Sequence, residues 1–179
     1  MVYGKRKSIA LIFFALFLPF LLYSLPAKDI EFLEGKDYFP RVKQLLERAE
    51  SSIYVVMYEM SYYHEYPLSP SNQLIQELIK AVKRGVNVMV ILDVSSYNEK
   101  NTKRNREAGK ILRKNGVMVR YDSLDIITHT KLLLIDNKYC IVGSHNWTYF
   151  GLSKNNEVSV MVESPSLGKE IIEWIKEKF

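Results

Sequence analysis

Two apolar strands joined by a short turn are the feature that most limits how this chain can fold. The stretch from His129 to Thr148 reads HTKLLLIDNKYCIVGSHNWT, and Asp136–Lys138 separates its two apolar runs. A turn of this length returns the chain antiparallel to itself, so the stretch predicts a β-hairpin. Side chains alternate between the two faces of a strand, which places His129 and Lys131 on the same face. A titratable base and a cation are therefore expected side by side where the hairpin begins.

The rest of the chain alternates between strand-like and helical patterns. Runs typical of strands occur at residues 30–35, 52–60, 86–95, 117–123 and 157–164. Patterns typical of helices cover residues 36–49, 73–84, 106–116 and 165–179. Ser71 or Asn72 is expected to cap the second of these helices, and Gly85 to end it. The alternation predicts an α/β fold in which helices flank both faces of a mixed, largely buried β-sheet.

Residues 1–27 differ in character from the remainder. Basic residues at positions 5–7 precede an apolar run over 9–22, and small residues follow at Ser24 and Ala27. This is the arrangement of a secretory signal peptide. The apolar run can be extended to Leu25, which is near the lower limit for a membrane span, so an uncleaved N-terminal anchor is the alternative. In either case, residues 28–179 are expected to form one exported domain, periplasmic or secreted.

Net charge alone does not identify a binding partner. The formal net charge is +5, but positions 5–7 supply three of these charges and residues 1–27 contain no Asp or Glu, so +2 remains for the domain. For polyanion binding, the clustering of positive charge matters more than the total. Seven basic residues lie between Glu99 and Lys114. They could hold a nucleic-acid backbone, or they could form a solvated helix face.

No metal ion or cofactor is expected. Cys140 is the single cysteine, so an intrachain disulfide and a cysteine-based zinc site are both excluded. Its apolar neighbours predict a small residue buried in the core. A divalent cation bound at His129 would be repelled by Lys131 on the same face. His129 could also be a strand histidine without a role, but the residues around it favour a functional site.

The returning strand is expected to complete that site. It ends in the sequence GSHN, in which Ser144 and Asn146 share one face and His145 takes the opposite one. Gly143 would let the backbone approach a ligand closely. A base, a cation, a hydroxyl and a carboxamide on one face suit a phosphodiester, whose non-bridging oxygens Lys131 and Asn146 would bind.

The same residues match a known signature. The spacing His-x-Lys, four residues, Asp, six residues, Gly-Ser-x-Asn resembles the HKD motif of the phospholipase D superfamily. Residues 30–179 are similar in layout to its small single-motif members, the Nuc-like and Zucchini-like group. The motif residues in this chain are His129, Lys131, Asp136, Gly143, Ser144 and Asn146. The resemblance implies metal-independent catalysis, in which one histidine forms a phosphohistidine and another protonates the leaving oxygen. Because this chain has one His-x-Lys, a homodimer would have to supply the second histidine.

The resemblance also implies supporting roles. Glu157, at the start of the next strand, would accept from the second ring nitrogen of His129 and so orient the ring, although it could instead be a solvated glutamate. Asp136 is expected to stabilise the turn rather than to contact substrate. His64 and His145 are expected at the surface or behind the catalytic residues, although either could line the cleft.

Together these features predict a nuclease, an endonuclease-like hydrolase of DNA or RNA. Tyr62, Tyr63 and Tyr66 could stack on bases, or they could pack beneath a loop or at an interface. A phospholipase or cardiolipin hydrolase with the same chemistry is the alternative enzyme, and it is favoured if residues 9–25 attach the chain to a membrane. A nucleic-acid-binding module with negligible turnover is an alternative of a different kind.

Overall fold

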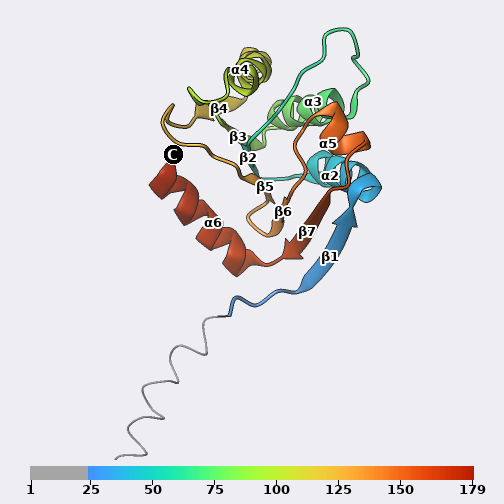
Figure 1. The fold of residues 1–179 in the computed structure, drawn as a ribbon. Helices are drawn as coiled ribbons and strands as arrows, with labels where there is room; N and C mark the ends of the chain where they lie inside the picture. The colour runs from blue at the N-terminus through green and yellow to red at the C-terminus, as the bar shows by residue number, and fades with distance from the viewer. Residues whose placement is uncertain (1–23) are drawn as a thin grey trace, which may run out of the picture.

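The computed structural model describes residues 24–179, and Figure 1 shows how their elements are arranged. The predicted signal peptide or anchor lies outside the described residues, except for residues 24–27. The strands are β1 (Asp29–Glu34), β2 (Ser52–Met57), β3 (Asn87–Leu92), β4 (Met118–Tyr121), β5 (Lys131–Ile135), β6 (Tyr139–Gly143) and β7 (Val158–Glu163). The helices are α2 (Gly35–Arg48), α3 (Pro70–Lys83), α4 (Glu99–Lys114), α5 (Tyr149–Ser153) and α6 (Pro165–Lys178). Within residues 24–179, no helix has both the length and the apolar character needed to cross a bilayer.

The sheet is mixed, as predicted. Within the described residues, seven strands form it in the order β1-β7-β6-β5-β2-β3-β4. Strands β2, β3 and β4 run parallel, whereas β5 is antiparallel to both β2 and β6. The predicted hairpin is the β5–β6 pair, and its turn has positive φ angles at Asp136 and Asn137. β5 therefore lies where the parallel half of the sheet meets the antiparallel half, and its first residue, Lys131, lies opposite Met57 at the carboxyl end of β2.

Helices cover both faces of the sheet. On one face, α2, α3, α4 and α5 pack over the larger core, in which Leu46, Leu78 and Leu112 are fully buried. On the other face, α6 packs over a smaller core through Ile171 and Ile175 (Figure 1). The predicted α/β architecture is therefore confirmed, with one helix on one face and the remaining described helices on the other.

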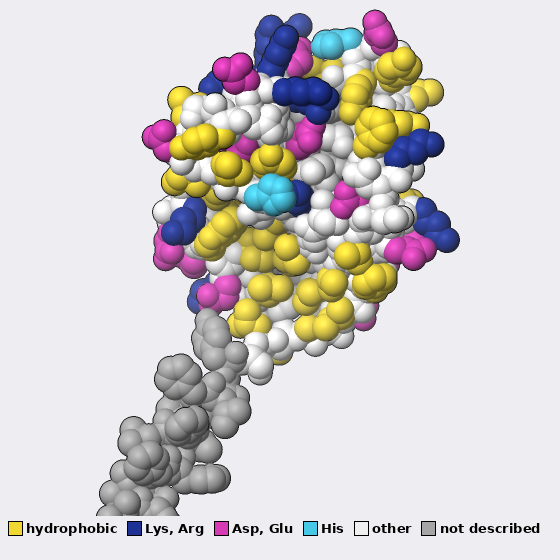
Figure 2. Space-filling view, in the orientation of Figure 1, with side chains coloured by type: hydrophobic (Ala, Val, Ile, Leu, Met, Phe, Trp, Pro, Cys, Tyr) yellow, Lys and Arg dark blue, Asp and Glu magenta, His cyan; other side chains and the backbone are white. Residues whose placement is uncertain are grey.

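Only part of the second face lies under α6. The smaller core contains residues of β2, β3, β5 and β6, and it leaves the same face of β1 and β7 open. One row of apolar side chains crosses this face through directly paired positions: Phe32, Val160, Val142 and Leu132. Phe32 is 68% exposed, and Figure 2 shows hydrophobic side chains gathered on this face of the molecule. An exposed apolar surface therefore extends from the β1 edge to Val142 on β6, whereas Leu132 at the start of β5 is buried.

The start of α3 differs from the expectation. The helix begins at Pro70, and Ser69 caps it by accepting from the Asn72 N–H at 3.4 Å. The predicted caps, Ser71 and Asn72, are therefore wrong. Both side chains are buried, and the Ser71 hydroxyl donates to the Ser61 carbonyl at 2.6 Å. Several neighbouring residues were able to cap this helix, and the packing of the adjoining loop decided between them.

Helix α4 is also longer than expected. It is one helix of 16 residues, whereas the sequence predicted a polar segment followed by a short helix. Asn98 caps it by accepting from the Asn101 N–H at 3.1 Å. Asn101 and Asn105 lie on its buried face, so polar residues occupy positions where a helical pattern is expected to be apolar. Helix α5 was not predicted, and Thr148 caps it by accepting from the Gly151 N–H at 3.0 Å.

Candidate active site

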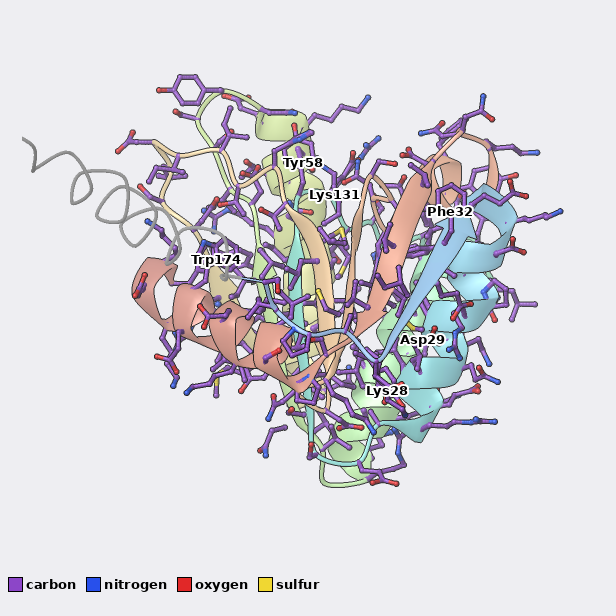
Figure 3. The ribbon with its side chains drawn as sticks, turned by 90° about the horizontal axis from the view of Figure 1, so that it is seen from below. Lys28, Asp29, Phe32, Tyr58, Lys131 and Trp174 are labelled. Atoms are coloured by element: carbon purple, nitrogen blue, oxygen red, sulfur yellow. The ribbon has the colours of Figure 1, made fainter. Side chains whose placement is uncertain are left out.

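Lys131 and His129 lie at the carboxyl end of β2, and both are near the Tyr58 ring. Lys131 is 7% exposed and donates from Nζ to the His129 carbonyl oxygen at 2.7 Å. Figure 3 shows Lys131 next to Tyr58. The Lys131 Nζ lies 4.6 Å from the centre of the Tyr58 ring, and the centres of the Tyr58 and His129 rings are 4.4 Å apart. His129 is exposed and lies two residues before β5 rather than within it. The two predicted side chains therefore meet through Tyr58, a residue that the motif does not identify.

The pKa values of both groups are lowered. Burial lowers the pKa of the Lys131 ammonium, and the carboxylates of Glu157, Asp93 and Glu59 oppose the shift. Burial also lowers the pKa of the His129 imidazole, and the positive charge of Lys131 adds to the effect. The lowered pKa favours the neutral imidazole, whose nitrogen lone pair is available for attack. Within residues 24–179, no group of three or more His, Cys, Asp or Glu side chains is placed to hold a metal ion.

The electrostatic coupling of this pair gives a first prediction. Because the Lys131 charge lowers the pKa of His129, Lys131→Met should raise that pKa, even though burial continues to lower it. The acid limb of the pH profile of kcat/KM should then move to higher pH, and the maximum value of kcat/KM should also fall. Lys131→Arg keeps the charge and should leave the limb near its original position. An acid limb that does not move in Lys131→Met would show that the charge does not act on the catalytic histidine.

A buried polar network next to Tyr58 holds the segment that carries His129. Asp93 follows β3, is fully buried and accepts from the Thr128 N–H at 2.8 Å. Asn101 donates to Asp93 Oδ2 at 3.1 Å and to the Tyr58 carbonyl at 2.8 Å. Asn105 donates to the carbonyls of Tyr58 and Asp93 at 2.7 and 2.8 Å. These contacts fix the ends of β2 and β3 against the residue before the histidine. The sequence contains only a weak indication of this network, namely Asp93, an acidic residue at the end of an apolar strand.

The second strand of the hairpin brings the remaining motif residues to the same end of the sheet. A Cβ on Gly143 would lie 2.2 Å from Ser159 Oγ and 2.3 Å from the Val158 carbonyl oxygen, so β7 requires this glycine. Packing against β7 is therefore sufficient to explain Gly143, and the expected approach of a ligand to its backbone is not needed. The Ser144 hydroxyl is exposed and accepts from the Val158 N–H at 3.1 Å. Asn146 Oδ1 is buried and has no partner among the described residues, which leaves its hydrogen-bonding capacity unused.

His145 lies in the core. It is fully buried, its ring stacks on Tyr38 with centroids 4.0 Å apart, and its Nδ1 lies 2.8 Å from Ser159 Oγ. Of the two positions expected for His145, the surface is excluded and a buried position behind the motif residues remains. Strand alternation gave the correct face, but it could not show that α2 covers that face. His64 is exposed and lies 3.2 Å from Glu107, so the surface position predicted for it is confirmed.

Glu157 lies close to the site. Its Oε1 accepts from Asn155 Nδ2 at 3.0 Å, and its charge raises the pKa values of Lys131 and His145 against the effect of burial. Within the described residues it makes no hydrogen bond with His129. Its role in orienting that ring stays a prediction, and its placement beside Lys131 indicates that it balances the buried ammonium.

Comparison with known proteins places this site in a family. The family model described as "Cardiolipin synthase, PLD-like domain" matches residues 42–179. The chain belongs to the phospholipase D superfamily. Phospholipase D of Rickettsia typhi is 31% identical over 138 residues, which are 76% of this chain and 61% of that protein. The mitochondrial cardiolipin hydrolase of Danio rerio is 28% identical over 130 residues, which are 72% of this chain and 51% of that protein.

The superfamily fold extends over the described domain. The crystal structure of Nuc from Salmonella typhimurium, a phospholipase D family member, matches this structure with a TM-score of 0.70 at 22% identity. The match covers 84% of this chain and 93% of Nuc. The resemblance drawn from the motif is thereby confirmed, as is the fold. The chain spans about three-fifths of the length of its rickettsial relative.

Asp136, the aspartate of the HKD motif, lies in the turn and binds backbone N–H groups of the segment before β2. Its carboxylate accepts from the N–H groups of Ser51, Ser52 and Glu50 at 2.8, 3.1 and 3.1 Å, at the opposite end of β5 from Lys131. Burial raises the pKa of Asp136, but these hydrogen bonds outweigh burial, so its pKa is lowered from the ordinary value. Asp136 therefore joins the hairpin to the segment before β2.

Asp136→Ala should lower the free energy of unfolding by about 2 kcal/mol at neutral pH, because three N–H groups lose a charged acceptor. The stabilisation is present above the unfolded-state pKa of about 3.9 and is lost as the pH falls through the lower folded-state pKa. The difference between wild type and variant should therefore shrink in strong acid. Urea unfolding at several pH values measures it, with the exposed Asp125→Ala as the control. Equal stability of Asp136→Ala and wild type at pH 7 would contradict the assignment.

The basic cluster on α4 has mixed roles. Arg104 forms an ion pair with Glu59, and the guanidinium groups of Arg106 and Arg113 lie 5.2 and 4.8 Å from the centre of the Tyr121 ring. The lysines of the cluster are exposed. Structural contacts therefore account for the arginines, and the lysines remain available to an anionic partner.

Proposed function

We propose that this member of the phospholipase D superfamily is a nuclease that hydrolyses DNA or RNA without a metal ion, at a site shared by two copies of the chain. The observation that carries the proposal is an exposed His129 whose backbone carbonyl accepts from the buried Lys131 ammonium at 2.7 Å. The described residues place no second histidine beside it, because His145 is in the core and His64 is paired with Glu107. One chain thus offers a nucleophile and a cation, and a second copy would offer the acid.

The proposed reaction has two displacements. A ring nitrogen of His129 attacks phosphorus, and the bond from phosphorus to the leaving oxygen breaks as His129 of the partner subunit donates a proton to that oxygen. The partner's His129, now neutral, then takes a proton from water, whose oxygen attacks phosphorus and breaks the phosphorus–nitrogen bond. Lys131 and Asn146 would donate to the non-bridging oxygens throughout. The products are an alcohol and a phosphate monoester.

Two identical histidines can take these opposite roles because their titrations are coupled. When one imidazole holds a proton, the second proton binds less readily to its neighbour, so the pair shares one proton over a range of pH. The lowered pKa of His129 keeps the nucleophilic copy neutral near pH 7. Activity should consequently show a bell-shaped pH dependence that belongs to the pair rather than to either ring.

The open apolar face supports pairing beside His129. The exposed part of the row, Phe32, Val160 and Val142, ends on β6, next to β5, and β1 lies three strand spacings from β5, about 14 Å. An interface of standard size covers about 800 Å² per partner, which is a patch of about 16 Å radius. A two-fold axis near His129 could therefore bury the exposed part of the row and bring the two imidazoles together.

Substrate class is tested with the full chain in EDTA. Single-stranded RNA, plasmid DNA and vesicles containing anionic lipid are incubated separately with equal amounts of enzyme. The proposal predicts cleavage of nucleic acid and no lipid hydrolysis. Lipid hydrolysis without nucleic-acid cleavage would support the alternative of a phospholipase, to which the names of two relatives point. Binding of nucleic acid without turnover would support a binding module.

A further inference from the structure

A cavity of about 730 Å³ opens beside the candidate active site, and aromatic rings form much of its wall. Tyr63 and Tyr66 come from the loop after β2, and Tyr149 and Phe150 come from α5. Asn146, a motif residue, lies in the same wall. The cavity therefore begins at a group that is proposed to bind the scissile phosphate.

The aromatic wall is held in place by hydrogen bonds. The Tyr63 hydroxyl accepts from the Tyr149 N–H at 3.0 Å, which joins the loop to α5. The buried Asn72 donates to the carbonyls of Tyr63 and Tyr66 at 2.8 and 3.1 Å and accepts from the Tyr63 N–H at 2.9 Å. The rings of Tyr149 and Phe150 meet edge to face with centroids 5.6 Å apart. A ligand would thus meet rings whose backbone is already fixed.

Polar groups connect the cavity to the phosphate-binding residues. The buried Asn146 Oδ1 has no partner in the described part of the chain. Glu59 lines the cavity, and its charge acts on Lys131. Asn155 also lines it and donates to Glu157, whose charge acts on Lys131 as well. A substrate with its phosphate at Lys131 would therefore place its neighbouring group at the mouth of this cavity.

The lining distinguishes a base from an acyl chain. Among the described residues, no Leu, Ile, Val or Met lines the cavity. Its apolar surface comes mainly from aromatic rings, with carboxylate, guanidinium, amide and hydroxyl groups between them. Flat rings with hydrogen-bonding groups at their edges fit a nucleobase, which stacks on its face and bonds at its edge. An acyl chain would find no aliphatic surface and would bury the polar groups without partners.

We propose that this cavity binds an unpaired nucleobase next to the scissile phosphate, so that the enzyme prefers single strands to duplexes. The inference rests on the proposed nuclease function. A base within a duplex is stacked on both faces and paired at its edge, so it cannot enter without leaving the helix.

The test compares three substrates: a single-stranded DNA oligonucleotide, its duplex with the complement, and bis(4-nitrophenyl) phosphate, a small diester without a base. The variant is Tyr66→Ala/Phe150→Ala, because these side chains are 65% and 64% exposed and their loss leaves the core intact. Tyr97→Ala, an exposed aromatic residue outside the cavity, is the matched control. Turnover of the small diester reports whether each protein is folded and assembled.

In the wild type, kcat/KM should be about tenfold or more higher for the single strand than for the duplex. In the double variant, the ratio of kcat/KM for the single strand to that for the small diester should fall about tenfold or more, mainly through KM. An unchanged ratio, or equal use of strand and duplex by the wild type, would overturn the cavity assignment while leaving the nuclease intact. A wild type that hydrolyses the small diester but neither nucleic acid would overturn the proposed function itself.

Discussion

His129→Ala is expected to lower kcat on every phosphodiester substrate by about ten-thousand-fold or more, because the covalent route loses its nucleophile and its acid together. Both roles depend on the same residue in two copies, so one substitution removes both from every site. The side chain is exposed and contacts the Tyr58 ring without a hydrogen bond among the described residues, so the fold and the proposed dimer should persist. Single-turnover and steady-state assays measure the loss, and sedimentation and thermal unfolding confirm the assembly.

The matched control for that loss is His64→Ala. His64 is also exposed, and it lies beside Glu107 rather than beside Lys131. Its removal should leave kcat near the wild-type value. If His129→Ala kept a kcat within about tenfold of the wild type, catalysis would have to run through another group, and the assignment would be wrong.

Phe32→Asp is expected to convert the proposed dimer to a monomer and to abolish turnover at concentrations where the wild type is dimeric. A carboxylate placed in an apolar interface costs about 2 kcal/mol or more, and two-fold symmetry introduces it twice, so the dissociation constant should rise about a thousandfold. Sedimentation velocity and activity are measured on the same samples.

Met118→Asp is the control for this substitution. Met118 is 55% exposed and pairs with Met89, so it lies on the same face of the sheet but on the opposite edge strand. It should stay dimeric and active. A Phe32→Asp monomer with full activity would show that one chain forms a complete site, and an unchanged dimer would place the interface elsewhere.

The parts of the fold that sequence could predict are those set by short-range rules. The hairpin follows from two apolar runs around Asp136, and all six motif residues lie within it or next to its ends. The end of α3 follows from Gly85, whose φ of 91° is a conformation that glycine adopts without strain. Both features depend on neighbours along the chain, so a pattern in the sequence reports them directly.

The parts that escaped prediction depend on neighbours in space. Tyr58, Asp93 and Asn105 come from three separate segments, and they form one network next to His129 only because β2, β3 and α4 converge at one end of the sheet. The first half of α4 was not predicted either. Its asparagines face inward and bind backbone carbonyls, at positions where a helical pattern is expected to be apolar. The burial of His145 could not be predicted for the same reason. Strand alternation gives the face of the sheet to which its side chain points, but not that α2 covers this face.

The central claim is that two copies of His129 act on one phosphorus atom, and subunit mixing tests it most directly. Wild type and His129→Ala are mixed in equal amounts, dissociated, allowed to reassociate, and assayed at constant total protein. If each site needs both histidines, only wild-type homodimers turn over, and total activity falls to about a quarter of that of the wild type alone. If each chain has its own complete site, activity falls only to about half, and that result would contradict the shared site.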